Sequence, residues 1–487
     1  MMLKWLGQIR SKAFETAILT GYAAIVASAI AHHEPWADEA QAWQLARNLS
    51  LHDLFVTYLH YDVHPILWYV LLRILNLMGI SYSGMHWICG AIGVAGTALF
   101  LFCSPFPKYL RALLPFTYFL LFQYAVVARG YVLIPLLFYL VALQWEKSIF
   151  STAVLLGLLA NVELHAAAIS GGFATVYLIE QLRDGAAKVP ARRNRLIIFA
   201  LILAFFYAFA LATAWPAHDQ QIWGITAHSR SVFIIAVQSL LLGLCDPLVI
   251  AFAFWVLFVF YLDERRKLIY LLPPLFFACF ATNYFTFWHA GLIVPLIVTI
   301  MWISWPASKG KRLPYEHACS VAFAVVCCVQ IAWSFNALNF DRHYAYSGDL
   351  AAAAFLKPYA ESNTVIAVTY IGQPDDRSFS AVGILPYFND HLYANWTVSY
   401  WWSSKGNRAE KDFETLLPSH PKIVVVETRD NSWDPIDLAD PKIQSLVRSG
   451  YRFTNQFCGT MPYRLGLGMR ICHLVFQYPN ELQTASH

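Results

Sequence analysis

A polar stretch that follows the first apolar run gathers most of the side chains able to do chemistry. The stretch holds six acidic or imidazole groups: His32, His33, Glu34, Asp38, Glu39 and His64. A carboxylate can remove the proton from an attacking hydroxyl group, and imidazole together with carboxylate can bind a divalent cation. The stretch therefore predicts either proton-transfer chemistry or a metal site beside an apolar segment.

Two short helices are expected to position these groups. Pro35 suits the first turn of a helix, and the apolar residues after it form a rough apolar face, so residues 35–49 are predicted to form a helix along a membrane interface. Ser50 opens a capping-box sequence, which predicts a second short helix running to Leu59. Acidic residues in a first helical turn are also favoured by the helix dipole alone, which leaves a purely structural interpretation of Asp38 open.

The composition is that of an integral membrane protein. Hydrophobic residues make up 58% of the 487 residues and charged residues 13%, about half the ~25% of a soluble domain. Apolar runs of near-spanning length recur from about residue 14 to residue 336. If the basic segments between them lie inside, the pattern predicts about 11 crossings in 11–13 helices. A transmembrane domain is thus expected over residues 1–340, with its first outer loop at 32–63.

From residue 341 to residue 487 polar residues return, and a soluble extracytoplasmic α/β domain is expected. Its predicted strands and helices are the strands near 364–370, 422–428 and 471–478 and the helices near 347–360, 409–417 and 440–449. Cys458 and Cys472 in this region could pair if the compartment is oxidising. The other cysteines lie in apolar runs and show no metal-ligand spacing.

The pair Asp38-Glu39, followed by Asp62-Val63-His64-Pro65 at the next span, resembles the protein O-mannosyltransferases. More broadly it is similar to the family-39 glycosyltransferases of the GT-C superfamily, which include the bacterial lipid A aminoarabinose transferases. The motif resemblance covers about residues 14–180. Ile66 stands where that family has a second proline, and no β-trefoil signature follows, so a protein acceptor is not implied.

The resemblance implies an inverting glycosyltransferase that takes a sugar from a polyprenyl phosphate. Its expected partners are this donor, membrane lipid and a glycan or lipid acceptor, and no nucleic acid. Asp38 matches the family's loop aspartate and would be the base, with Glu39 beside it as the second catalytic residue. Arg129, followed two residues later by Tyr131, matches a recurrent pattern of the family and would bind the departing phosphate.

Further substrate-binding candidates come from the first loop and from the outer ends of spans: Glu34, Asp62, His64, Glu163, His165 and His289. Interfacial placement without function is the alternative for Arg129 and for the two span-end histidines. Arg73 falls inside an apolar run, where it is either functional or extended toward the inner surface. No cofactor is implied as required, and His32 and His33 are weak candidates for a divalent metal.

Three other functions stay open at this stage. A transporter or flippase of lipid-linked glycans also needs many spans, although its site is expected near the membrane midplane. A non-catalytic glycan binder, or an oligosaccharide ligase or polymerase with a diphosphate donor, would use the same outer cations. The expected location is the bacterial inner membrane, with the active face toward the periplasm.

Overall fold

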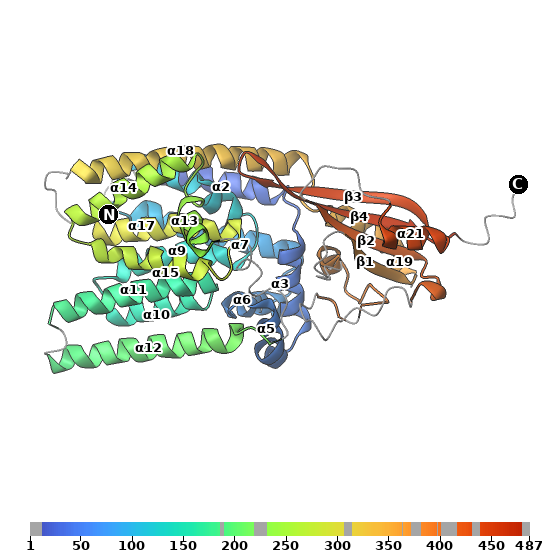
Figure 1. Cartoon of the computed structure of the whole chain (residues 1–487), viewed down its shortest axis with the longest axis horizontal. Coiled ribbons are helices and arrows are strands. Elements are labelled where there is room, and N and C mark those ends of the chain that lie inside the picture. Colours follow the sequence, from blue (N-terminus) through green and yellow to red (C-terminus); the bar gives the residue numbers. More distant parts are fainter. Residues whose placement is uncertain are drawn as a thin grey trace, which may run out of the picture.

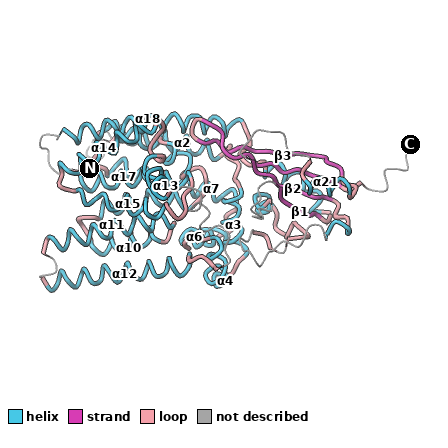
Figure 2. Tube along the Cα trace, in the orientation of Figure 1, coloured by secondary structure: helices cyan, strands magenta, loops and turns pink. Residues whose placement is uncertain are grey.

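The architecture was obtained as a computed structural model (Figure 1). It describes residues 12–185, 189–218, 231–305, 314–362, 364–371, 381–396, 398–400, 416–430 and 439–479. A helical bundle occupies one end of the molecule and a mixed sheet the other (Figures 1 and 2).

Long apolar helices run along the bundle. Four of those described are long and apolar enough to cross a membrane: α2 (Ala13–Ile30), α7 (Tyr82–Cys103), α12 (Pro190–Ala214) and α18 (Pro314–His343). On α12, Leu201 and Phe205 are 63% and 66% exposed. Such apolar surface is what a bilayer covers, so the chain is an integral membrane protein, as its composition predicts.

Further helices complete the bundle. They are α6 (Leu67–Leu77), α8 (Lys108–Leu113), α9 (Leu133–Gln144), α10 (Ile149–Ala160), α11 (Leu164–Arg183), α13 (Val232–Leu241), α14 (Leu248–Glu264), α15 (Leu272–Ala281), α16 (Phe287–Ala290) and α17 (Ile293–Ser304). Short irregular helical turns join some of them: η2 (Leu114–Phe116), η3 (Phe119–Gln123), η4 (Gly130–Val132) and η7 (Leu268–Leu271). The number of crossings stays a prediction.

The first loop contains the two expected helices. Helix α3 (Ala37–Asn48) lies across the end of the bundle, between the bundle and the sheet (Figure 1). The second is a run of short turns: α4 (Leu51–Asp53), η1 (Leu54–Tyr58) and α5 (Leu59–Asp62). The side chain of Ser50 accepts a hydrogen bond from the backbone N–H of Asp53, as the capping sequence predicts.

Arg73 fixes the far end of α3. Its Nη1 donates to the backbone carbonyls of Ala46 and Arg47, at 3.0 Å and 2.9 Å. These carbonyls have no partner within the helix, and a cation there is favoured by the helix dipole. Arg73 is thus a capping residue of α3, and its position relative to the membrane surfaces stays a prediction.

A four-stranded mixed sheet follows the bundle, in the order β1-β2-β4-β3. Strands β1 (Ile366–Ile371) and β2 (Ile423–Asp430) are parallel, while β2 with β4 (Gly466–Gln477) and β4 with β3 (Arg452–Tyr463) are antiparallel. Helix α19 (Asp349–Glu361), helix α21 (Pro441–Arg448), η8 (Val382–Tyr387) and η9 (Leu417–Ser419) complete this part.

The three expected strands and two of the expected helices are present. Strand β3 was missed because its polar residues, exposed along an edge strand, give no buried run. The helix expected near 409–417 falls mostly outside the described residues. Cys458 and Cys472 face each other on β3 and β4 and form a disulfide.

Two contacts fix the sheet to the bundle. The turn between β3 and β4 reaches back to the bundle, where Arg464 pairs with Asp246 and its guanidinium lies 4.8 Å from the ring centre of Trp333. The second contact begins at Glu34, whose carboxylate accepts backbone hydrogen bonds at the start of α19. Helix α3 is thereby enclosed between the two parts of the molecule.

Candidate active site

An ion pair between Asp38 and Arg129 stands at the end of the bundle that meets the sheet. Asp38 is in the first turn of α3, and Arg129 precedes η4. Asp38 Oδ2 lies 2.5 Å from Arg129 Nη1, and the two side chains are 18% and 14% exposed. Burial alone would lower the pKa of Arg129, but the carboxylate of Asp38 raises it, so the guanidinium stays charged. The sequence-predicted base and phosphate ligand are therefore neighbours that solvent can reach.

His64 extends this group of charges. Its Nε2 lies 3.4 Å from Arg129 Nη2, and its Nδ1 lies 2.6 Å from the backbone carbonyl of Asp62. Val63 adopts a left-handed backbone with φ of 55°, which is rare for a β-branched residue. The turn brings His64 back beside Asp62, whose carboxylate accepts a hydrogen bond from Tyr69. Both predicted residues of this motif thus lie at the ion pair.

A second cluster lies behind the first. Glu163 caps α11, since its Oε2 accepts the backbone N–H of His165 at 2.6 Å. Its Oε1 lies 2.9 Å from His165 Nδ1 and 3.8 Å from His289 Nε2, and the two imidazole rings stack at 4.0 Å. A cavity of about 20 Å³, room for about one water molecule, is lined by His64, Arg129 and Glu163 among others. It connects the two clusters.

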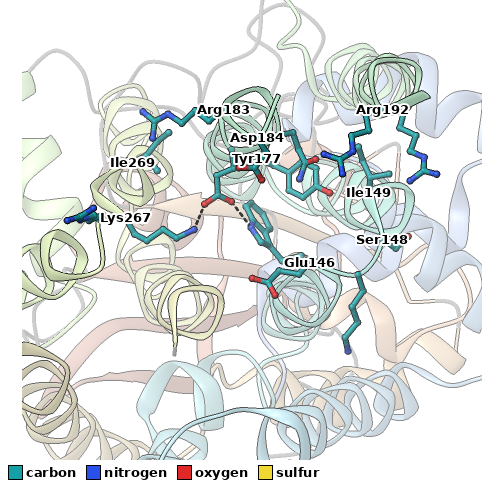
Figure 3. A pocket seen from close by; sticks show the side chains of 15 residues that line it. Glu146, Ser148, Ile149, Tyr177, Arg183, Asp184, Arg192, Lys267 and Ile269 are labelled. Atoms are coloured by element: carbon teal, nitrogen blue, oxygen red, sulfur yellow. Dashed lines mark hydrogen bonds and ion pairs between the residues drawn. The ribbon is translucent and has the colours of Figure 1, made fainter. Parts of the chain in front are cut away.

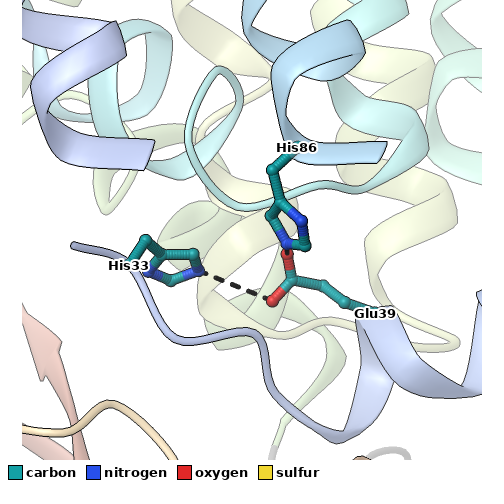
Figure 4. A group of neighbouring side chains, drawn as sticks. All are labelled: His33, Glu39 and His86. Carbon is teal, nitrogen blue, oxygen red and sulfur yellow. Dashed lines mark hydrogen bonds and ion pairs between the residues drawn. The ribbon is translucent and has the colours of Figure 1, made fainter. Parts of the chain in front are cut away.

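Glu39 is completely buried and lies between His33 and His86 (Figure 4). Its Oε1 lies 2.9 Å from His86 Nε2 and accepts the N–H of Ala128 at 2.6 Å. Its Oε2 accepts the N–H of Trp36 at 3.0 Å and lies 3.6 Å from His33 Nε2. Because neighbouring residues surround its carboxylate, Glu39 does not reach the accessible side of α3. A catalytic role for Glu39 beside Asp38 stays a prediction, and its burial favours a role in positioning.

His33 lies between two carboxylates. Its Nδ1 is 3.0 Å from Asp341 Oδ2, near the end of α18, and its Nε2 faces Glu39. Burial alone would lower the pKa of His33, but Asp341 and Glu39 raise it to about 10. Burial would raise the pKa of Glu39, but His86 and His33 hold it well below its ordinary value. The structure therefore favours an imidazolium between two carboxylates at neutral pH.

Two sets of side chains within the described residues have donor atoms close enough to hold a metal ion. They are His33 with Glu39 and His86, and Glu163 with His165 and His289. His32 belongs to neither, because it is exposed and its Nδ1 bonds to the backbone carbonyl of Ser28 at 2.8 Å. Of the two weak metal candidates, only His33 is in a suitable cluster.

Glu34 bonds to the beginning of α19, while its expected part in substrate binding stays a prediction. Its carboxylate accepts the N–H groups of Ser347, Gly348 and Leu350, at 3.3, 3.1 and 2.7 Å. Glu34 thus connects the first loop to α19.

Sequence reasoning missed three residues of these clusters, namely Tyr69, His86 and Asp341. His86 had a usable signal, because a lone imidazole within the apolar run of α7 needs a polar partner. Asp341 has no local signal, since its partner His33 is 308 residues away in the sequence.

Comparison with solved structures finds the crystal structure of ArnT from Cupriavidus metallidurans bound to undecaprenyl phosphate. The sequence identity is 9% and the TM-score 0.52, with 94% of this chain and 98% of that chain covered. The chain has an ArnT-like fold. Comparisons with protein-family models and with curated proteins found no match. At this identity the likeness establishes the fold alone, and it confirms the helical membrane domain and C-terminal sheet expected from the sequence.

Proposed function

We propose that this chain is an inverting glycosyltransferase that moves a sugar from a polyprenyl phosphate to an acceptor hydroxyl at the non-cytoplasmic membrane face. The observation that carries the proposal is the partly exposed ion pair of Asp38 and Arg129. A base and a phosphate ligand stand there side by side, at the bundle end that meets the sheet. The undecaprenyl phosphate bound to the ArnT structure supports the class of donor.

In the proposed reaction the acceptor oxygen attacks the anomeric carbon from the side opposite the phosphate. Its proton goes to the carboxylate of Asp38 as the new C–O bond forms, a role worth ~10²–10⁴ in rate. The bond between that carbon and the phosphate oxygen breaks, and its electron pair leaves with the polyprenyl phosphate. Arg129 stabilises the departing charge.

The ion pair suggests how the base becomes available. In the absence of donor, Arg129 neutralises Asp38. A donor phosphate offers Arg129 two oxygens in the geometry that a guanidinium prefers. When the donor is in place, the guanidinium of Arg129 would change its partner from Asp38 to the phosphate, which frees the carboxylate of Asp38. His64, which lies beside Arg129, would bind the same phosphate.

Glu39 is assigned a positioning role, because it fixes the start of α3 through Trp36 and the segment before Arg129 through Ala128. No metal is required in this scheme. The proposed setting is a bacterial inner membrane with the sheet in the periplasm, where the disulfide between Cys458 and Cys472 would be stable.

The test is sugar transfer in detergent by wild type, Asp38→Asn and the control Asp53→Asn. Asp53 is an exposed acid of the same loop, where its carboxylate bonds to Ser50 and lies near His52. The substrates are a panel of polyprenyl phosphate sugars with host lipid or glycan acceptors, and polyprenyl phosphate release is the readout. We expect release by wild type and Asp53→Asn, and a loss of ~10²–10⁴ for Asp38→Asn.

Other outcomes would point to the alternative functions. Turnover restricted to diphosphate-linked donors would assign the protein as a ligase or polymerase. Donor binding without turnover, unchanged in Asp38→Asn, would favour a transporter or a non-catalytic binder of lipid-linked glycans.

A further inference from the structure

A second pocket, of about 640 Å³, lies at the opposite end of the bundle from the candidate active site. Helix α11 connects the two, since Glu163 caps its beginning and Arg183 is its last residue. Its 20 residues span ~30 Å at the rise of an α-helix, about the thickness of the hydrocarbon core. The pocket therefore lies at the other membrane surface.

Charged side chains from four segments surround this pocket (Figure 3). The cations on its wall come from the turn before α10, the end of α11, the start of α12 and the segment before α15: Lys147, Arg183, Arg192, Arg195, Arg266 and Lys267. Figure 3 shows Lys267 on one side of the pocket and Arg192 on the other. The wall thus presents positive charge from several directions.

Much of this charge is not neutralised within the protein. Lys267 pairs with Glu180, which also accepts hydrogen bonds from Tyr270 at 3.0 Å and Trp145 at 3.1 Å. Within the described part of the chain, the other five cations of the wall form no ion pair. The wall's two other carboxylates, Glu146 and Asp184, form none either. A net positive pocket remains, with room for a headgroup-sized anion.

The surface beside the pocket is apolar. On α12, Ile197, Ile198 and Leu201 are exposed directly after the basic turn that carries Arg192 and Arg195. Leu268, next to Lys267, is exposed as well. A ligand whose phosphate sits among the arginines could therefore lay acyl chains along apolar helix surface without leaving the membrane.

We propose that this pocket binds the phosphate headgroup of an anionic membrane phospholipid. A phosphodiester supplies the acceptor oxygens that arginine binds best, and basic pockets between membrane helices are suited to such headgroups. The adjoining apolar surface favours a lipid over a soluble phosphate compound. The site is separate from the proposed transfer reaction and does not depend on it.

The test measures retention of dioleoylphosphatidylglycerol by the full-length protein in phosphatidylcholine nanodiscs, followed by native mass spectrometry. Arg195→Gln is compared with the matched control Arg193→Gln. Both arginines are exposed in the first turns of α12, but Arg193 does not line the pocket. We expect Arg195→Gln to weaken retention about fivefold, Arg192→Gln to act alike, and Arg193→Gln to match wild type. Asp38→Asn should retain the lipid fully.

Equal losses for Arg195→Gln and Arg193→Gln would overturn the proposal, because the cations would then act only through general surface charge. Retention of phosphatidylcholine equal to that of dioleoylphosphatidylglycerol would also overturn the proposal. Inorganic phosphate and undecaprenyl phosphate are added in separate arms. Displacement by millimolar phosphate would assign a soluble ligand, and preferential displacement by undecaprenyl phosphate would assign the carrier lipid instead. Melting curves in phosphatidylcholine confirm that each variant is folded.

Discussion

Asp38 and Arg129 form an ion pair of 2.5 Å between the first interfacial helix and the segment that precedes η4. In a partly exposed position such a pair adds little to folding stability, because solvent screens it. Its position at the bundle end that meets the sheet makes function the better explanation. If Arg129 exchanges the carboxylate of Asp38 for the donor phosphate, donor binding makes the base Asp38 available.

Replacement of Arg129 is the first prediction that this arrangement makes. Arg129→Gln should lower kcat for sugar transfer by ~10²–10³, since one preorganised group facing the departing charge is lost. Arg129→Lys should recover part of the rate, because it keeps the charge without the two-pronged geometry. Steady-state kinetics on a donor found active in the panel of polyprenyl phosphate sugars measure both variants, with Arg193→Gln as control. Wild-type kinetics in Arg129→Gln would exclude contact with the phosphate.

The alkaline stability of the protein should depend on His33. Because folding raises the pKa of His33 from 6.5 to about 10, its protonated form stabilises the fold fully below pH ~6.5. That contribution is lost as pH rises through 10. The melting temperature of wild type should therefore fall from pH 7 to pH 10 by several degrees more than that of His33→Gln.

His32→Gln is the matched control for this experiment, since His32 is exposed and lies one residue away. It should follow the wild-type pH profile. Parallel profiles for wild type and His33→Gln would show that folding does not raise the pKa of His33.

The sequence predicted the parts of the site that local patterns encode. The two loop helices follow from Pro35 and Ser50, and the nearness of Asp38 to the membrane follows from the apolar runs on either side. What the sequence could not provide was orientation. Glu34 was expected among the substrate-binding residues, yet α3 begins only at Ala37, so Glu34 precedes the helix and reaches α19.

Pairing across the fold was equally hidden from local patterns. His33 and Asp341 come from distant parts of the sequence, and neither residue's neighbours predict the other. Arg129 could be placed near Asp38 only through a family resemblance, because the segment between η3 and η4 has no regular periodicity.

Glu34 should hold the sheet against the bundle. Its carboxylate accepts N–H groups at the beginning of α19, where the helix dipole favours negative charge. Glu34→Gln should therefore lower the free energy of unfolding by ~1.5–3 kcal/mol and speed proteolysis of the chain after His343. Glu361→Gln, at the exposed far end of α19, serves as control. Equal protease sensitivity of the two variants would contradict this role.

Sugar transfer should persist after divalent metals are removed. His33 Nδ1 is already paired with Asp341 at 3.0 Å, and its Nε2 faces Glu39 at 3.6 Å. Both oxygens of Glu39 are already held by backbone N–H groups and by His86. Transfer is measured after dialysis against EDTA, and then after addition of Zn²⁺ or Mn²⁺. Loss of activity that either ion restores would instead make His33, Glu39 and His86 the first ligand set to test, by His86→Gln and metal analysis of the purified protein.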